Sequence, residues 1–139
     1  MTTAQSWLIV GGLVNLLISV LAAYVLYWQR VRRPDVPAPR YALVAHKVAL
    51  WNGFLLLGLS VAILHTGFAE PVNNALAAAQ VFGTFLAVGS NLQRWSSGKS
   101  DQFLEGPPWR VRLIGTAHLI DLVVISAVLY GVTRTALGL

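Results

Sequence analysis

Three histidines and one aspartate lie inside long apolar segments of this sequence. His46 and His65 belong to one segment, and His118 and Asp121 belong to another. An ionisable side chain at the centre of a bilayer costs about 2.5–3.5 kcal/mol on insertion scales, so such residues are the first candidates for function. An imidazole is an acid or base near neutral pH and a ligand for metals and haem iron.

The first histidine of the second apolar segment, His46, has two readings. It is a metal or haem ligand, or an interfacial histidine that is hydrogen-bonded to a neighbouring helix. At 1.5 Å per residue, His46 and His118 lie roughly 7 and 8 Å below the cytoplasmic boundary, at a shared depth. His65 is expected near the outer interface, where an imidazole stays hydrated.

Asp121 follows His118 by one helical turn and lies on nearly the same face. The two form a buried structural pair, or Asp121 orients or charges His118 as part of a proton relay or as support for a cofactor. Asn52 and Asn91 either link helices by hydrogen bonds or belong to a site.

The residue types limit which cofactors the chain is expected to bind. The chain has no cysteine and no closely spaced ligand pair of the HExxH type, which argues against zinc. Haem needs only one imidazole per iron face and tolerates apolar surroundings. Basic side chains at the cytoplasmic helix ends either pair with haem propionates or only set the topology: Arg40, Lys47, Arg110 and Arg112.

Four helices must position these residues. The chain has 139 residues, of which 56% are hydrophobic and 11% charged, with a mean hydropathy of +0.65. This composition argues against a soluble domain, and it excludes intrinsic disorder and a large catalytic domain outside the bilayer. Four apolar blocks of about 20 residues each match the thickness of a bilayer. We expect one transmembrane domain over 1–139, an all-α antiparallel four-helix bundle with helices at 7–28, 41–66, 74–93 and 113–132.

The basic residues indicate the orientation. Eight of the ten Lys and Arg residues lie in the loops 29–40 and 94–112 or directly beside them. The positive-inside rule places both loops in the cytoplasm and both termini outside, in a multi-pass protein of the inner (plasma) membrane. The net charge of +5 is therefore a topological signal, and no nucleic-acid partner is expected.

Residues 45–70 resemble the styrene oxide isomerases, which are small four-helix membrane enzymes. The likeness is carried by Ala45-His46, then five residues, then Asn52-Gly53, and by Gly67-Phe68-Ala69 followed by Glu70. The resemblance implies a haem b protein in which His46 ligates the iron and Asn52 hydrogen-bonds the substrate oxygen. It also implies a homotrimer with haem between the subunits. His46 and Asn52 point about 120° apart on a helix, which suits two different subunit faces.

The third helix departs from the family. The family tyrosine and aspartate fall at or near Asn91 and at Gly83 or Thr84, so neither side chain is retained. Asn91 keeps the capacity to donate a hydrogen bond, and Asp121 on the fourth helix is a candidate to replace the acid.

Three hypotheses follow. The first is a haem b enzyme that isomerises a small apolar epoxide to an aldehyde, with His46 as the ligand and Asn52 and Asn91 as catalytic residues. The second is a b-type cytochrome in which His118 is the second axial ligand. The third is a cofactor-free accessory membrane subunit.

Overall fold

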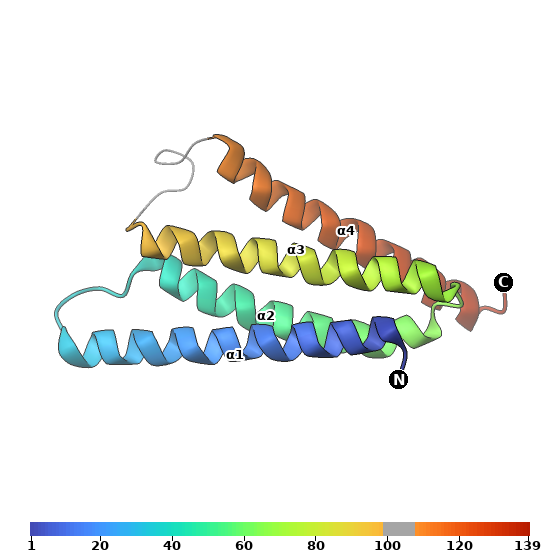
Figure 1. Ribbon diagram of the computed structural model, residues 1–139, viewed down its shortest axis with the longest axis horizontal. Coiled ribbons are helices and arrows are strands. Elements are labelled where there is room, and N and C mark those ends of the chain that lie inside the picture. Colours follow the sequence, from blue (N-terminus) through green and yellow to red (C-terminus); the bar gives the residue numbers. More distant parts are fainter. Residues whose placement is uncertain (99–107) are drawn as a thin grey trace.

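The computed structural model is a bundle of four long antiparallel helices, with both termini at the same end (Figure 1). It describes the backbone of residues 1–98 and 108–139 and the side chains of residues 1–98 and 112–139. The helices are α1 (Thr3–Arg32), α2 (Arg40–Ala62), α3 (Glu70–Ser96) and α4 (Pro108–Ala136), and the short 3-10 helix η1 (Ile63–His65) continues α2. The described residues contain no strand, and the predicted all-α four-helix bundle is confirmed.

All four helices are long and apolar enough to cross a membrane. α1, with 30 residues, is about 45 Å long against a hydrocarbon core of about 30 Å. The chain is therefore built as a multi-pass membrane protein.

α1, α3 and α4 extend beyond the apolar blocks that predict them, whereas α2 ends at Ala62 and η1 at His65, before the predicted end at residue 66. α1 begins earlier than expected because the Thr2 hydroxyl accepts a hydrogen bond from the Gln5 backbone N–H at 3.2 Å. α3 begins at Glu70 rather than near 74, with an acidic residue and Pro71 in its first turn, which both favour a helix start. Hydropathy follows the membrane-embedded part of a helix, whereas polar ends stay helical outside it.

α1 and α2 pack closely where two glycines meet. A Cβ on Gly53 would lie 2.6 Å from Leu16 Cδ2, and a Cβ on Gly12 would lie 3.1 Å from the Gly53 carbonyl oxygen. The alanines that precede this crossing on α2 are fully buried. These small residues bring the backbones together and fix the position of His46 and Asn52 relative to α1.

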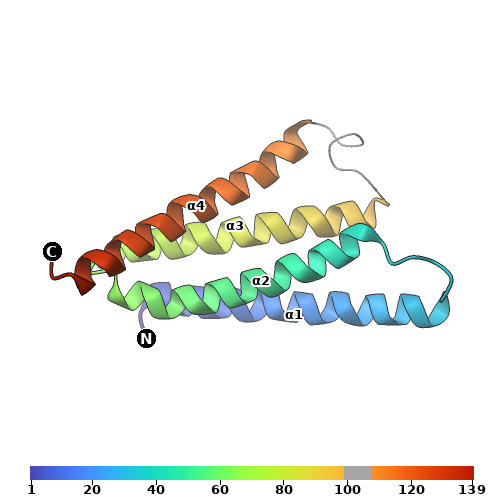
Figure 2. The ribbon, with the colours of Figure 1, turned by 180° about the vertical axis from the view of Figure 1, so that it is seen from behind.

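α4 is the least covered helix. In its most apolar stretch 17% of the residues are buried, against 33–39% in the other three helices. It touches α3 closely at Gly83, where a Cβ would lie 3.0 Å from Ile120 Cγ2. Towards Pro108 it leans away from α3 in both ribbon views (Figures 1 and 2). Much of its surface is left to lipid or to another protein.

Candidate functional site

His46 is held by α1 through one of its ring nitrogens. Its Nδ1 lies 2.9 Å from the Ser19 hydroxyl oxygen and 3.0 Å from the Ser19 carbonyl oxygen. A carbonyl only accepts hydrogen bonds, so Nδ1 carries the proton and Nε2 carries the lone pair. Histidines that ligate metals show this arrangement: the ring nitrogen that does not bind the metal donates its N–H to a backbone carbonyl or a carboxylate, which fixes the orientation of the ring.

Ser19 was not among the residues that the sequence pointed to. It is almost fully buried, whereas the His46 ring beside it is half-buried. A single hydroxyl in an apolar helix carries no signal of its own, because its partner lies 27 residues away on another helix.

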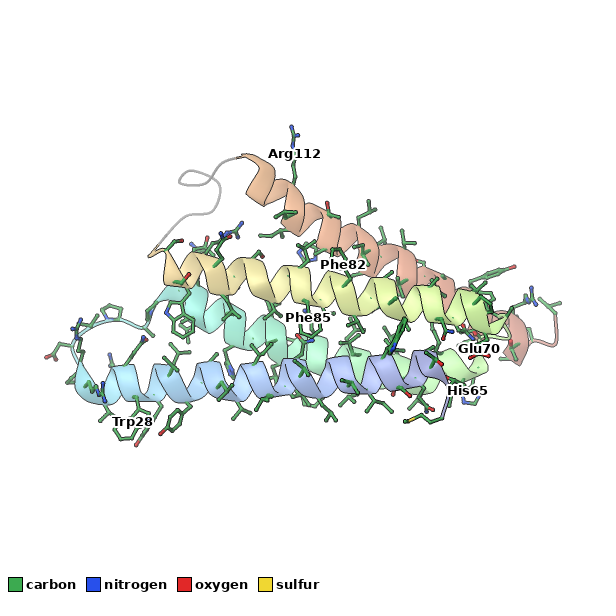
Figure 3. The ribbon with its side chains drawn as sticks, in the orientation of Figure 1. Trp28, His65, Glu70, Phe82, Phe85 and Arg112 are labelled. Carbon is green, nitrogen blue, oxygen red and sulfur yellow. The ribbon has the colours of Figure 1, made fainter. Side chains whose placement is uncertain are left out.

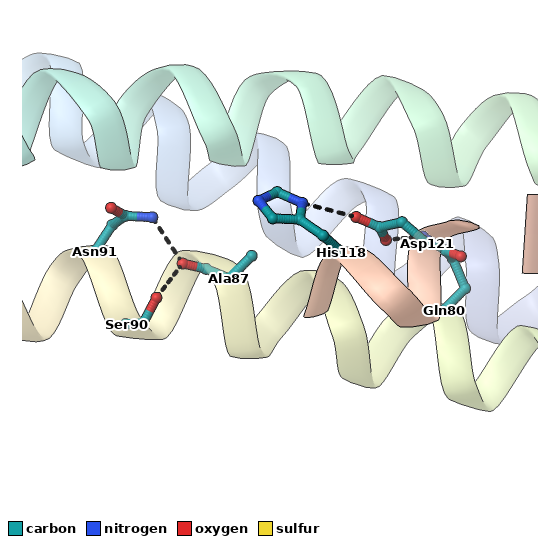
Figure 4. Close-up of polar contacts among 6 residues, drawn as sticks. All are labelled: Gln80, Ala87, Ser90, Asn91, His118 and Asp121. Atoms are coloured by element: carbon teal, nitrogen blue, oxygen red, sulfur yellow. Dashed lines mark hydrogen bonds and ion pairs between the residues drawn. The ribbon is translucent and has the colours of Figure 1, made fainter. Parts of the chain in front are cut away.

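Asn52 lies on α2 directly before the glycine crossing. Its side chain is half-buried and makes no hydrogen bond within the described part of the chain. Its amide is therefore available to a group from outside this chain. Asn91 differs, since it is buried and donates from Nδ2 to the Ala87 carbonyl oxygen at 2.9 Å on its own helix (Figure 4).

The basic residues divide into two groups. Arg40 and Lys47 are exposed near the start of α2, and the side chain of Arg110 lies outside the described residues. Arg94, which the sequence placed at the start of a loop, is buried in the last turns of α3. Its guanidinium lies 5.6 Å from the centre of the Tyr41 ring, a cation–π contact between α3 and α2.

A second polar cluster joins α3 and α4. Gln80 Nε2 donates to Asp121 Oδ1 at 2.6 Å, and Asp121 Oδ2 lies 3.8 Å from His118 Nδ1 (Figure 4). Gln80 is fully buried, while the His118 side chain is 72% exposed. His118 and Asp121 were expected as neighbours, and Gln80 was missed.

A polar stripe on α3 is the sequence signal that could have revealed Gln80. Gln80, Thr84, Asn91 and Arg94 follow a spacing of three, four or seven residues and are all buried. Thr84 also meets Asn15 of α1, whose Nδ2 lies 3.4 Å from the Thr84 hydroxyl. Polar residues at this spacing in an apolar helix mark a buried face that bonds to its neighbours.

The histidines do not form one site. His65 and Glu70 lie at the end of the bundle that carries the termini, and Trp28 and Arg112 lie towards the opposite end (Figure 3). His46 bonds to α1 and His118 faces Asp121 on its own helix, with no bond between them within the described residues. Residues 1–98 and 112–139 contain no group of three or more His, Asp or Glu side chains that could hold a metal ion.

The available donors are therefore single imidazoles, which suit axial ligation of haem. No family model and no curated protein matches the chain.

Proposed function

We propose that this chain is a membrane haem b protein of the inner (plasma) membrane, with His46 as the axial ligand, that isomerises a small apolar epoxide to an aldehyde. The observation that carries the proposal is the pair of contacts between His46 Nδ1 and Ser19, which leaves Nε2 as the ligating nitrogen. The likeness of residues 45–70 to styrene oxide isomerases supports the same residue in the same role.

The surroundings of His46 suit an apolar macrocycle on the outside of the chain. Ala42, Ala45 and Ala49 are fully buried against α1, so this part of the bundle is filled. The half-buried ring of His46 lies at its edge, and exposed Arg40 and Lys47 lie close by in sequence to pair with propionates. We also propose a homotrimer with haem between its subunits, as the resemblance to the styrene oxide isomerases implies.

The reaction is redox-neutral, and its atoms balance. One epoxide C–O bond breaks, a hydride moves to the neighbouring carbon, and the carbonyl forms without gain or loss of atoms. Bound haem supplies a Lewis acid for the epoxide oxygen. Asn52, whose amide makes no bond within the described chain, donates a hydrogen bond to the substrate oxygen and orients it. Asn91 is the second candidate donor, once its amide is released from Ala87.

One variant and a product assay test the proposed reaction. Purified protein is incubated with styrene oxide, and phenylacetaldehyde is measured by gas chromatography. Asn52→Leu should keep the haem absorption spectrum and lose about a hundredfold in kcat, the usual effect of removing one such donor. Full activity of Asn52→Leu, or no aldehyde from haem-loaded protein, would overturn the proposed reaction.

The affinity for haem tests the contact between Ser19 and His46. Ser19→Ala removes the hydroxyl but keeps the carbonyl that also faces His46 Nδ1, so we expect haem to bind about tenfold more weakly. Haem titration followed by absorption measures this change. Unchanged affinity would show that the hydroxyl plays no part.

The alternative cytochrome needs His118 as the second ligand. Within the described residues His46 bonds to Ser19 and His118 faces Asp121, and no contact there brings the two histidines together. His118→Ala should leave the ferric spectrum unchanged if the isomerase proposal holds, and a change of spin state would favour the cytochrome.

A further inference from the structure

The cluster of Gln80, Asp121 and His118 lies deep in the membrane-spanning part of the chain. Asp121 is nine residues from Arg112 and thirteen from Arg134, which corresponds to roughly 13 and 20 Å along the helix. The proposed haem site does not use these residues. Ionisable side chains at this depth mark functional sites more often than structural ones.

The contacts in the cluster hold a carboxylate beside the imidazole. Fully buried Gln80 holds Asp121 Oδ1 at 2.6 Å, so the other carboxylate oxygen is fixed where it lies 3.8 Å from His118 Nδ1. The carboxylate attracts the proton to Nδ1, and the lone pair is then on Nε2. Nε2, on the far side of the ring from the carboxylate, is then the nitrogen that accepts a hydrogen bond.

The packing of α4 against α3 does not explain why a histidine lies at position 118. The bond between Gln80 and Asp121 already links α3 to α4, whereas the His118 side chain is 72% exposed. Gly115 lies one turn earlier on the same face of α4, and a Cβ there would meet nothing within 4 Å. The outer surface of α4 is therefore uncovered at Gly115, beside the exposed imidazole.

We propose that His118, beside the carboxylate of Asp121 that Gln80 holds, binds a small apolar alcohol or phenol that enters from the lipid and donates its O–H to Nε2. The exposed side chains of Leu119 and Leu122 provide apolar contact for the rest of such a molecule. An acceptor nitrogen in hydrocarbon gains more from one hydrogen bond than it would in water, because no water competes for it. The site is separate from His46 and does not depend on haem.

The test uses protein labelled with ¹⁵N-histidine in lipid nanodiscs, with 4-ethylphenol as the probe. The matched control probe, 4-ethylanisole, has the same ring and oxygen but no O–H. We expect 4-ethylphenol to shift the His118 Nε2 resonance in a saturable way, and 4-ethylanisole to leave it unchanged. The response should persist in the His46→Ala variant, so failure of the haem proposal would not affect it.

Two glycine variants locate the binding site. Gly115→Leu should fill the space beside His118 and abolish the saturable shift. Gly89→Leu on α3 is the control, since a Cβ at Gly89 also meets nothing within 4 Å. Equal shifts with both probes, no shift with either, or a response that survives Gly115→Leu or is lost in His46→Ala would each overturn the proposal.

Discussion

The hydrogen bond between Gln80 and Asp121 makes a quantitative prediction about how α4 is held. Gln80→Leu, Asp121→Leu and the double variant form a thermodynamic cycle that isolates this contact. A hydrogen bond to a charged group is worth about 1.5–3 kcal/mol in soluble proteins, but cycles in membrane proteins average about 0.6 and reach about 1.7 kcal/mol. Because this bond is 2.6 Å long and Gln80 is fully buried, we expect a coupling free energy of about 1–1.7 kcal/mol.

The single variants should differ in their effects. Gln80→Leu leaves the Asp121 carboxylate with only His118, at 3.8 Å, and should destabilise the bundle more than Asp121→Leu, which removes the charge itself. Unfolding free energies measured by steric trapping in bicelles provide all four corners of the cycle. Asn15 and Thr84, 3.4 Å apart, form a control pair with an expected coupling below about 0.6 kcal/mol. A coupling near zero for Gln80 and Asp121, or a harmless Gln80→Leu, would refute this reasoning.

Two further predictions concern packing and topology. Gly53→Ala should lower the unfolding free energy by about 1–3 kcal/mol, because the added methyl meets Leu16 on α1, whereas Gly58→Ala, at an open position on the same helix, should be neutral or stabilising. Equal unfolding free energies for the two variants would contradict the tight crossing of α1 and α2. The chain has no cysteine, so a membrane-impermeant maleimide on intact cells should label Ala69→Cys, and Ser97→Cys only after permeabilisation. The reverse labelling would invert the proposed orientation.

The number and order of the helices could be read from the sequence, but their ends could not. Apolar blocks reveal the part of a helix that lies in hydrocarbon. The polar last turn of α1 and the start of α3 at Glu70 remain helical through backbone hydrogen bonds, which hydropathy does not register. The lean of α4 was also beyond the sequence, since it depends on where Gly83 lets Ile120 approach.

The candidate site was predictable in its ionisable members and not in their partners. His46, His118 and Asp121 stand out because charge is rare in apolar segments. Ser19 and Gln80 are ordinary polar residues whose role depends on which helix lies opposite, and that is a property of the packed bundle. Ser19 decides which ring nitrogen of His46 is available, and Gln80 holds the carboxylate that lies beside His118.

The absorption spectrum of the haem-reconstituted His46→Ala variant tests the central claim most directly, with His65→Ala, at the end of η1, as the matched control. If His46 is the haem ligand, wild type and His65→Ala retain a Soret band after removal of free haem, and His46→Ala loses it. A Soret band of full intensity in His46→Ala would contradict the assignment of His46 as the ligand.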